Sequence, residues 1–261
     1  MNYLMGIDVG TTGAKAAIMD IAGNLVAQAY REYACSYPCP GWVEQDANML
    51  LETTFVVAAE AVRKAGVPPE EIASIAFSAQ RCCTIPVGRD GKLVRPMISW
   101  QDNRTAEEVE LIRKEVSDDD FYDIVRLPQS TTWMLSKILW LQRHEPEAWA
   151  RVHKVVQLHD FLLYSWGAPD FYVDHCDAAF YGCWDTAQLK WSDRLLKIGQ
   201  VNPAQLSTPR ANGERVGGIS ELVAKATGLK AETSSGATCS RSSVRVGSPP
   251  ARRTRLFCSW R

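Results

Sequence analysis

The chain has 261 residues, of which 46% are hydrophobic and 23% charged, and its formal net charge is −1. This composition excludes disordered, collagen-like and disulfide-scaffold classes, and the length is enough for one large core or two modest ones. The sequence has no uninterrupted apolar run of the length, about 18 residues, that suggests a membrane span, and its N-terminus lacks a secretory signal pattern. We therefore expect a cytoplasmic protein that makes no contact with a membrane.

The charge is divided unevenly along the chain. Residues 233–261 carry six arginines and no lysine or acidic residue, so residues 1–232 hold 23 basic against 30 acidic side chains, a net charge of −7. The eight cysteines show neither a C-x-x-C motif nor paired metal-ligand spacing. They are therefore expected to be reduced thiols, not parts of a zinc site or a disulfide framework.

The first third of the chain reads as a meander followed by a helix and a strand. Apolar stretches predict strands over residues 3–8, 14–20 and 25–30, separated by turn signals. Asp46 is the expected N-cap of a helix through residue 64, Gly66 its stop, and residues 72–78 a buried strand.

The middle of the chain alternates between strand and helix signals. The pattern predicts a strand pair at residues 82–87 around the turn at 90–91, helices over 104–116, 131–143 and 160–166, and a strand over 154–157. A three-strand meander followed by alternating helices and strands indicates an α/β fold with a mixed sheet flanked by helices.

Residues 231–261 differ in kind from everything before them. They contain seven serines and six arginines, and they follow neither a helical nor a strand period. Two interpretations stay open: a flexible basic tail, and a frame-shifted or otherwise aberrant terminus. Nucleic acid is not an expected partner, because the segment lacks the interleaved aromatic and basic residues of a stacking surface. We accordingly place one domain at residues 1–230 and a disordered or frame-shifted tail at 231–261.

The most informative segment is residues 6–13 (GIDVGTTG), followed by Lys15. Its two later glycines, Gly10 and Gly13, would let the turn adopt positive φ and approach a ligand closely, while the backbone N–H groups and the hydroxyls of Thr11 and Thr12 would cradle phosphate oxygens. A carboxylate at the end of the first strand, Asp8, could hold Mg²⁺ through water. The alternative is a polar hairpin without a ligand. P-loop and dinucleotide-binding signatures are absent from the sequence.

Four motifs in order resemble the FGGY carbohydrate kinases, the group that includes glycerol kinase and xylulokinase. They are GIDVGTTG at 6–13, GWVEQD at 41–46, SWQDNR at 99–104 and KILWLQRHEP at 137–146. The resemblance covers residues 2–230, which correspond to the N-terminal, sugar-binding domain of that family. It implies the actin-like, ribonuclease-H-like ATPase fold, MgATP as cofactor, and a sugar or polyol as the small-molecule partner; we also expect a homodimer.

The resemblance assigns roles position by position. Asp8 resembles the metal-linked aspartate, and the phosphate-binding turn matches Gly10, Thr11, Thr12, Gly13 and Lys15. The substrate-contacting positions match Gln80, Arg81, Cys82, Trp100, Gln101 and Asp102. Cys82 departs from the family, which has Glu or His there, and a thiol is a weaker hydrogen-bonding group than either.

Each of these assignments has a structural alternative. Trp100 could be a core aromatic, Arg81 a surface cation or ion-pair member, and residues 42–46 a cap for the following helix. Asp174 and Asp177, which flank His175, are expected to be structural. The four histidines have no metal-ligand spacing.

The general base of the family is not found. By resemblance it is an aspartate soon after the position of Leu229, where this chain has TSSGATC at 233–239 and no aspartate beyond Asp193. The second, ATP-binding domain of the family is also absent from the sequence. We therefore expect a truncated form of a sugar or polyol kinase with little or no activity. The alternatives are a non-catalytic sugar-binding or regulatory module, and a kinase completed by a separate C-terminal chain. Residues 137–146 favour a pentulose and Arg81 a glycerol-like polyol.

Overall fold

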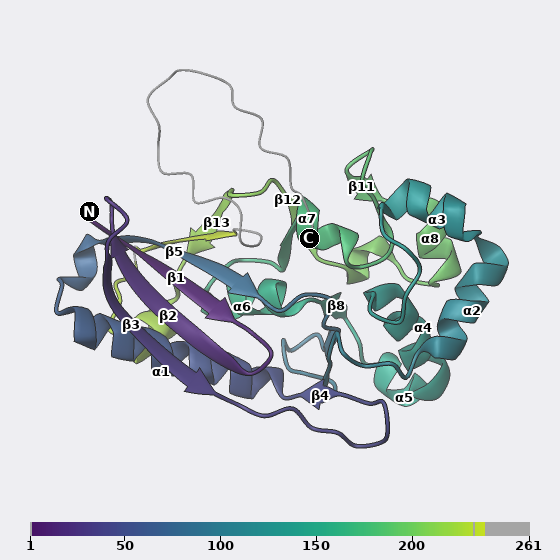
Figure 1. The fold of residues 1–261 in the computed structure, drawn as a ribbon, viewed down its shortest axis with the longest axis horizontal. Coiled ribbons are helices and arrows are strands. Elements are labelled where there is room, and N and C mark those ends of the chain that lie inside the picture. The colour runs from purple at the N-terminus through teal and green to yellow at the C-terminus, as the bar shows by residue number, and fades with distance from the viewer. Residues whose placement is uncertain (1, 232, 238–261) are drawn as a thin grey trace.

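The computed structural model describes residues 2–231 and 233–237, and for residues 234–237 the backbone alone. Its centre is a six-stranded mixed sheet with the strand order β13-β14-β5-β1-β2-β3 (Figure 1). The strands of this sheet are β1 (Tyr3–Val9), β2 (Gly13–Asp20), β3 (Leu25–Glu32), β5 (Ile72–Ala79), β13 (Arg215–Gly218) and β14 (Ser234–Ala237). β1, β2 and β3 form the predicted antiparallel meander, while β5 runs parallel to β1 and β14 parallel to β5.

Helices cover one face of this sheet. The helices on this side are α1 (Ala47–Ala65), α6 (Leu158–Trp166) and α9 (Glu221–Thr227). Alternate residues of the strands point toward α1 and α6, and Phe77 packs edge-on against Trp166 with ring centroids 5.0 Å apart. The alternating pattern read from the sequence is thus the pattern of one buried sheet face.

Local signals set the ends of α1 as predicted. Asp46 accepts a hydrogen bond from the N–H of Asn48, and Gly66 has the left-handed conformation with φ 62°. An aspartate N-cap and a left-handed glycine after the last turn are the standard ways of satisfying helix ends.

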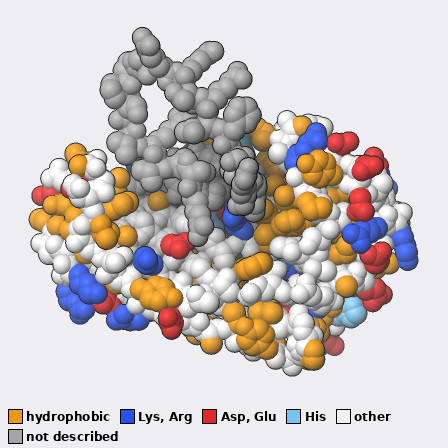
Figure 2. Space-filling model, viewed as in Figure 1, with side chains coloured by type: hydrophobic (Ala, Val, Ile, Leu, Met, Phe, Trp, Pro, Cys, Tyr) orange, Lys and Arg blue, Asp and Glu red, His pale blue; other side chains and the backbone are white. Residues whose placement is uncertain are grey.

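A second core lies beyond the sheet, among short helices and loops (Figure 1). Its elements are α2 (Ala106–Glu115), α3 (Asp118–Val125), α4 (Met134–His144), α5 (Pro146–Trp149), α7 (His175–Ala179) and α8 (Asp193–Ile198). On this side, charges of both signs lie close together at the surface over α2 and α3 (Figure 2). The expected helix 104–116 is α2, with Val116 capping its end.

The remaining elements are short strands and single-turn helices. These elements are β4 (Glu44–Gln45), β6 (Ile85–Val87), β7 (Met97–Ile98), β8 (Lys154–Val156), β9 (Tyr172–Asp174), β10 (Trp184–Asp185), β11 (Lys190–Trp191), β12 (Thr208–Arg210), η1 (Pro69–Glu71) and η2 (Pro203–Gln205). The predicted strand at 82–87 contains β6, which pairs with β8. Across the turn at 90–91 the same segment also forms antiparallel bridges from Val87 to Leu93 and from Thr84 to Ile98. The turn signal thus indicated the pairing of the two segments on either side of it, and the pairing with β8 is the part that the sequence did not predict.

The central sheet includes a strand that lies beyond the boundary expected at residue 230. β14 inserts between β13 and β5, and its residues Ser234–Ala237 pair in register with Ser74–Phe77 of β5. A strand flanked on both sides is held by its neighbours' backbone hydrogen bonds, so it needs little apolar periodicity of its own. The rest of the Ser/Arg-rich segment, residues 238–261, lies outside the described residues. The two interpretations of this segment, and the prediction that it does not bind nucleic acid, concern residues outside the description.

Three further findings bear on the expectations. Among the residues described, no helix is both long and apolar enough to cross a membrane. The six cysteines in the described part of the chain form no disulfide with one another, and the other two lie outside it. Asp174 is structural as expected, because its side chain accepts hydrogen bonds from the N–H groups of Cys176 and Asp177 at the start of α7.

Candidate functional site

The turn between β1 and β2 is tight, but not for the reason expected. Neither Gly10 nor Gly13 has a positive φ. Gly13 is needed for space, since a Cβ there would lie 2.5 Å from the Tyr30 hydroxyl and 2.6 Å from the Arg31 carbonyl oxygen, whereas one at Gly10 would meet nothing closer than 3.5 Å. The Gly10 N–H donates to the Gly13 carbonyl at 3.0 Å, and the Tyr33 hydroxyl donates to the Gly10 carbonyl at 2.6 Å. Tyr33, which the sequence did not single out, therefore anchors the turn.

Asp8 and Lys15 are charged residues that flank this turn. They are directly opposite each other in the β1–β2 register, and both are exposed. Within the described part of the chain, neither side chain forms an ion pair or a hydrogen bond. A purely structural hairpin does not require an exposed carboxylate and an exposed ammonium that are unpaired among the described residues.

Thr11 connects the turn to the sugar-side residues. Its hydroxyl donates to Gln80 Oε1 at 3.3 Å and accepts from Trp100 Nε1 at 3.1 Å. Gln45 closes a ring, since its Nε2 donates to the Thr11 carbonyl at 3.0 Å and its Oε1 accepts from Gln80 Nε2 at 2.7 Å. The structure therefore brings Thr11, Gln80 and Trp100 together, and adds buried Gln45 as a member that the sequence analysis did not assign to the site.

Trp100 and Arg81 both present surface to solvent. Trp100 is 41% exposed, so the core-aromatic alternative is wrong. Arg81 forms no ion pair among the described residues, and its guanidinium lies 4.9 Å from the centre of the Phe180 ring. Gln101 is also exposed, and its side chain has no hydrogen-bond partner in the described part of the structure.

Asp102 is misassigned as a substrate-contacting residue in this structure. Its side chain is fully buried against the equally buried Arg104, with 2.8 Å between Arg104 Nη2 and Asp102 Oδ2. The carboxylate also accepts from the N–H of Val43 at 2.6 Å, from the N–H of Arg104 at 3.0 Å and from Arg104 Nε at 2.9 Å. A carboxylate with these four oxygen acceptor positions taken has none to offer a ligand.

The Asp102–Arg104 pair belongs to a buried network that explains the GWVEQD motif. Arg104 also donates to Glu44, which pairs with Arg95. The Arg104 guanidinium lies 3.8 Å from the centre of the Trp42 ring. The motif is thus more than a cap for α1: Trp42 and Glu44 hold Arg104, Gln45 joins the Thr11 ring, and Asp46 caps the helix.

Cys82 points away from solvent. Its side chain is 5% exposed, and burial raises the pKa of the thiol to about 12. The thiol is therefore neutral at physiological pH and replaces neither a carboxylate nor an imidazole as a hydrogen-bonding partner of substrate.

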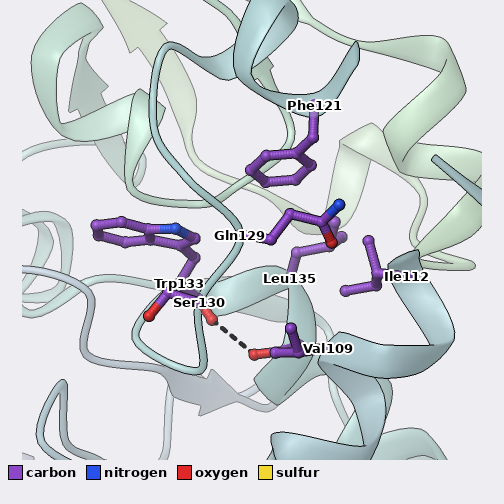
Figure 3. Close-up of a pocket in the computed structure, with 8 residues that line it drawn as sticks. Val109, Ile112, Phe121, Gln129, Ser130, Trp133 and Leu135 are labelled. Atoms are coloured by element: carbon purple, nitrogen blue, oxygen red, sulfur yellow. Dashed lines mark hydrogen bonds between the residues drawn. The ribbon is translucent and has the colours of Figure 1, made fainter. Parts of the chain in front are cut away.

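Neither of two hollows in the described structure is lined by Gln80, Arg81, Trp100 or Gln101. The first, between α2, α3 and the segment before α4, has a volume of about 10 Å³ (Figure 3). That is room for a single water at most, which could reach the unpaired Oε1 of Gln129. The second, about 600 Å³, is open and is lined by Lys15, Arg31 and Lys64, of which the last two already pair with Glu60. Neither hollow therefore coincides with the residues around Thr11.

The sheet order and the flanking helices place this molecule in the class of actin-like, ribonuclease-H-like α/β domains. The chain belongs to the FGGY family of carbohydrate kinases: residues 3–239 match the family's N-terminal domain.

Similar proteins and solved structures support this assignment to the family. The chain is 31% identical over 219 residues to a glycerol kinase of Thermococcus onnurineus, covering 82% of this chain and 44% of that protein. It is 28% identical over 228 residues to a xylulose kinase of Lactococcus lactis, covering 86% and 44%. In fold it is similar to the xylulose kinase of Rhodospirillum rubrum, with a TM-score of 0.87 and 24% identity over 91% of this chain and 49% of that one. The chain thus spans about half the length of the relatives it matches.

Proposed function

We propose that this domain binds a sugar or polyol, and that in a complete protein of the family it presents a substrate hydroxyl to MgATP for phosphoryl transfer. The observation that carries the proposal is the double contact of Thr11, whose hydroxyl is hydrogen-bonded to both Gln80 and Trp100. Because Thr11 also belongs to the turn beside Asp8, groups suited to phosphate and groups suited to a polyol share one surface.

The residues around the turn fit a metal-bound nucleotide phosphate. Mg²⁺ prefers oxygen ligands, and the exposed carboxylate of Asp8 would supply one at the end of β1, directly or through water. Lys15 and the hydroxyl of exposed Thr12 are placed to meet phosphate oxygens. When bound, Mg²⁺ would neutralise charge on the phosphoryl group; these side chains would orient the phosphates against the substrate.

The proposed sugar-binding residues are those whose side chains are exposed to solvent. Arg81 and Gln101 offer donors and acceptors to hydroxyl groups, and the exposed ring of Trp100 offers an apolar wall. Asp102 contributes only through Arg104 and Val43, by holding the loop that carries Trp100.

We expect the 261-residue chain alone to show negligible ATP-dependent phosphorylation of xylulose, ribulose, glycerol or erythritol. Residues 233–239 contain no carboxylate where the resemblance places the general base. A coupled ADP-release assay would measure this, and turnover at or above about 1 s⁻¹, the low end of ordinary enzymes, would show that the base lies elsewhere. The same missing carboxylate favours the second candidate, a non-catalytic sugar-binding or regulatory module. The cytoplasmic location and the homodimer stay predictions.

The test of the proposal is sugar binding by the chain as it stands. We expect ligand-observed NMR with a panel of pentuloses and polyols to detect binding no tighter than about millimolar, because an open surface leaves much of a small ligand in water. Arg81→Ala and Trp100→Ala should each abolish the signal, while Arg89→Ala and Tyr122→Ala, which remove equally exposed side chains elsewhere, should not. Equal binding by all five proteins, or no binding by the wild type, would refute the proposal.

A further inference from the structure

The backbone at Cys82 has an unusual conformation for its residue type. Cys82 has φ 62°, in the left-handed region that glycine usually occupies, and it is buried. A non-glycine residue held there is strained and persists only where its surroundings fix it. It directly follows Arg81, the exposed cation of the proposed sugar site.

Two buried side chains hold the peptide groups on either side of the Cys82 α-carbon. The N–H of Cys82 donates to Gln157 Oε1 at 2.9 Å, and the carbonyl of Cys82 accepts from Lys137 Nζ at 2.9 Å. Gln157 is the N-cap residue of α6, and Lys137 lies within α4, so two helices fix one residue from opposite sides.

Each of these side chains has a second backbone partner. Lys137 Nζ also donates to the carbonyl of Thr132 at 2.8 Å, and Gln157 Nε2 donates to the carbonyl of Asp177 at 2.7 Å. Four segments are therefore joined through two side chains: the Cys82 loop, the approach to α4, the start of α6, and α7.

Burying the charged side chain of Lys137 beside Cys82 is energetically unfavourable. Its side chain is fully buried, it forms no ion pair in the described part of the chain, and burial lowers its pKa to about 8. An apolar side chain would avoid the desolvation of the ammonium. The hydrogen bonds from Nζ to two carbonyl oxygens offset this desolvation. The neutral amine still has two N–H groups for the same two acceptors.

The same contacts determine where Arg81 lies. Its guanidinium lies over the ring of Phe180, which ends α7, and α7 is tied to Gln157 through the carbonyl of Asp177. Fixing Cys82 therefore fixes both Arg81 and the aromatic ring beneath it.

We propose that Lys137 and Gln157 are positioning residues, which hold Cys82 in its left-handed conformation and thereby aim Arg81 at the sugar or polyol. This inference rests on the proposed function for its sugar-binding part. The clamp itself, meaning the contacts of Lys137 and Gln157 with Cys82, is open to separate measurement.

The clamp is tested first in the wild type, by hydrogen exchange of the Cys82 amide. We expect protection comparable to that of β5, because both its peptide groups are held by buried partners. Exchange as fast as in an exposed loop would overturn the proposal without any variant.

Variants then separate the clamp from general stability. Lys137→Met removes one contact and Gln157→Leu the other; Lys154→Met is the control, since Lys154 Nζ also donates to a backbone carbonyl, that of Leu206, at 2.9 Å. We expect native-state alkylation of Cys82 by N-ethylmaleimide to be at least tenfold faster in either clamp variant, with buried Cys183 unchanged and the control like the wild type. Parallel rises at Cys82 and Cys183 would mean that the residues serve only overall stability, and an unchanged Cys82 would mean that no clamp exists.

Binding completes the test. Either clamp variant should weaken polyol binding at least tenfold at a temperature where it is still fully folded, and Lys154→Met should not. Full affinity in a variant with an opened Cys82 would overturn the positioning role. If instead the wild type binds no polyol, or Arg81→Ala binds as well as the wild type, the proposed function fails while exchange and alkylation still decide the clamp.

Discussion

The Asp8 turn and the Asp102 loop use the same kinds of charged residue for opposite purposes. Asp8 and Lys15 are exposed and unpaired among the described residues, although the β1–β2 register places them opposite each other. Asp102 and Arg104 are fully buried and hydrogen-bonded to each other and to the backbone. A buried ion pair cannot lose one partner without leaving an uncompensated charge in the core, so its residues serve the fold. Exposed charges with no partner among the described residues can instead bind a ligand.

The largest effect is expected from breaking the buried pair. Asp102→Asn should lower the free energy of unfolding by about 3–5 kcal/mol, because it leaves Arg104 buried with a diminished counter-charge. Asp118→Asn, which disrupts an exposed pair with Arg113 at 3.3 Å, should cost no more than about 1 kcal/mol. Urea unfolding measures both, and a stable Asp102→Asn protein that has lost sugar binding would restore Asp102 to the site.

A second effect depends on pH. Burial, with the nearby carboxylates of Asp174 and Asp160, raises the pKa of Asp177 to about 7, against the opposing effects of His159 and Arg81. Between pH of about 4 and 7 the folded chain keeps a proton that the unfolded chain has released, so its free energy of unfolding falls as the pH rises.

Asp177→Asn removes this titration. Its stability relative to the wild type should increase between pH 5 and 7 by up to about 1.4 kcal/mol per pH unit. Exposed Asp119, replaced by Asn, is the control and should show a constant difference. Thermal melts across this range give the answer, and parallel curves for Asp177→Asn and the wild type would contradict the raised pKa.

The two glycines of the turn give an intermediate effect. Gly13→Ala should cost about 1–3 kcal/mol, because the new Cβ would collide with the backbone of Arg31 and the Tyr30 hydroxyl. Gly10→Ala meets nothing closer than 3.5 Å and should cost less than 1 kcal/mol. Comparable losses from the two variants in chemical denaturation would mean that the turn needs glycine for backbone freedom at both positions.

The smallest effect on stability is expected at Asp8. Asp8→Asn should change the free energy of unfolding by no more than about 0.5 kcal/mol, because the carboxylate has no partner to lose among the described residues. In a longer chain that also carries the family's C-terminal domain, the same change should lower turnover far more than sugar affinity. Melting temperature and turnover measured on one preparation check both parts, and a destabilised but fully active protein would remove Asp8 from the site.

The sequence by itself determined the features that depend on neighbours along the chain. Alternating apolar residues gave the β1–β3 meander, and Asp46 and Gly66 gave the ends of α1, because strand pleating and helix capping are local. The family was also identified from four motifs, and the match over residues 3–239 confirms it.

Only the tertiary structure decided the long-range pairings and the burial of individual charges. β14 is a strand because β13 and β5 flank it, and β6 pairs with β8 across more than sixty positions of sequence, from Ile85 to Val156. Asp8 and Asp102 differ in solvation and in partners, and Gln45, Lys137 and Gln157 acquire their contacts from residues distant in the chain. A sequence pattern shows which residue types are present, but desolvation and hydrogen-bond geometry are set by the segments that meet in three dimensions, and these decide whether a charge binds a ligand or holds the fold together.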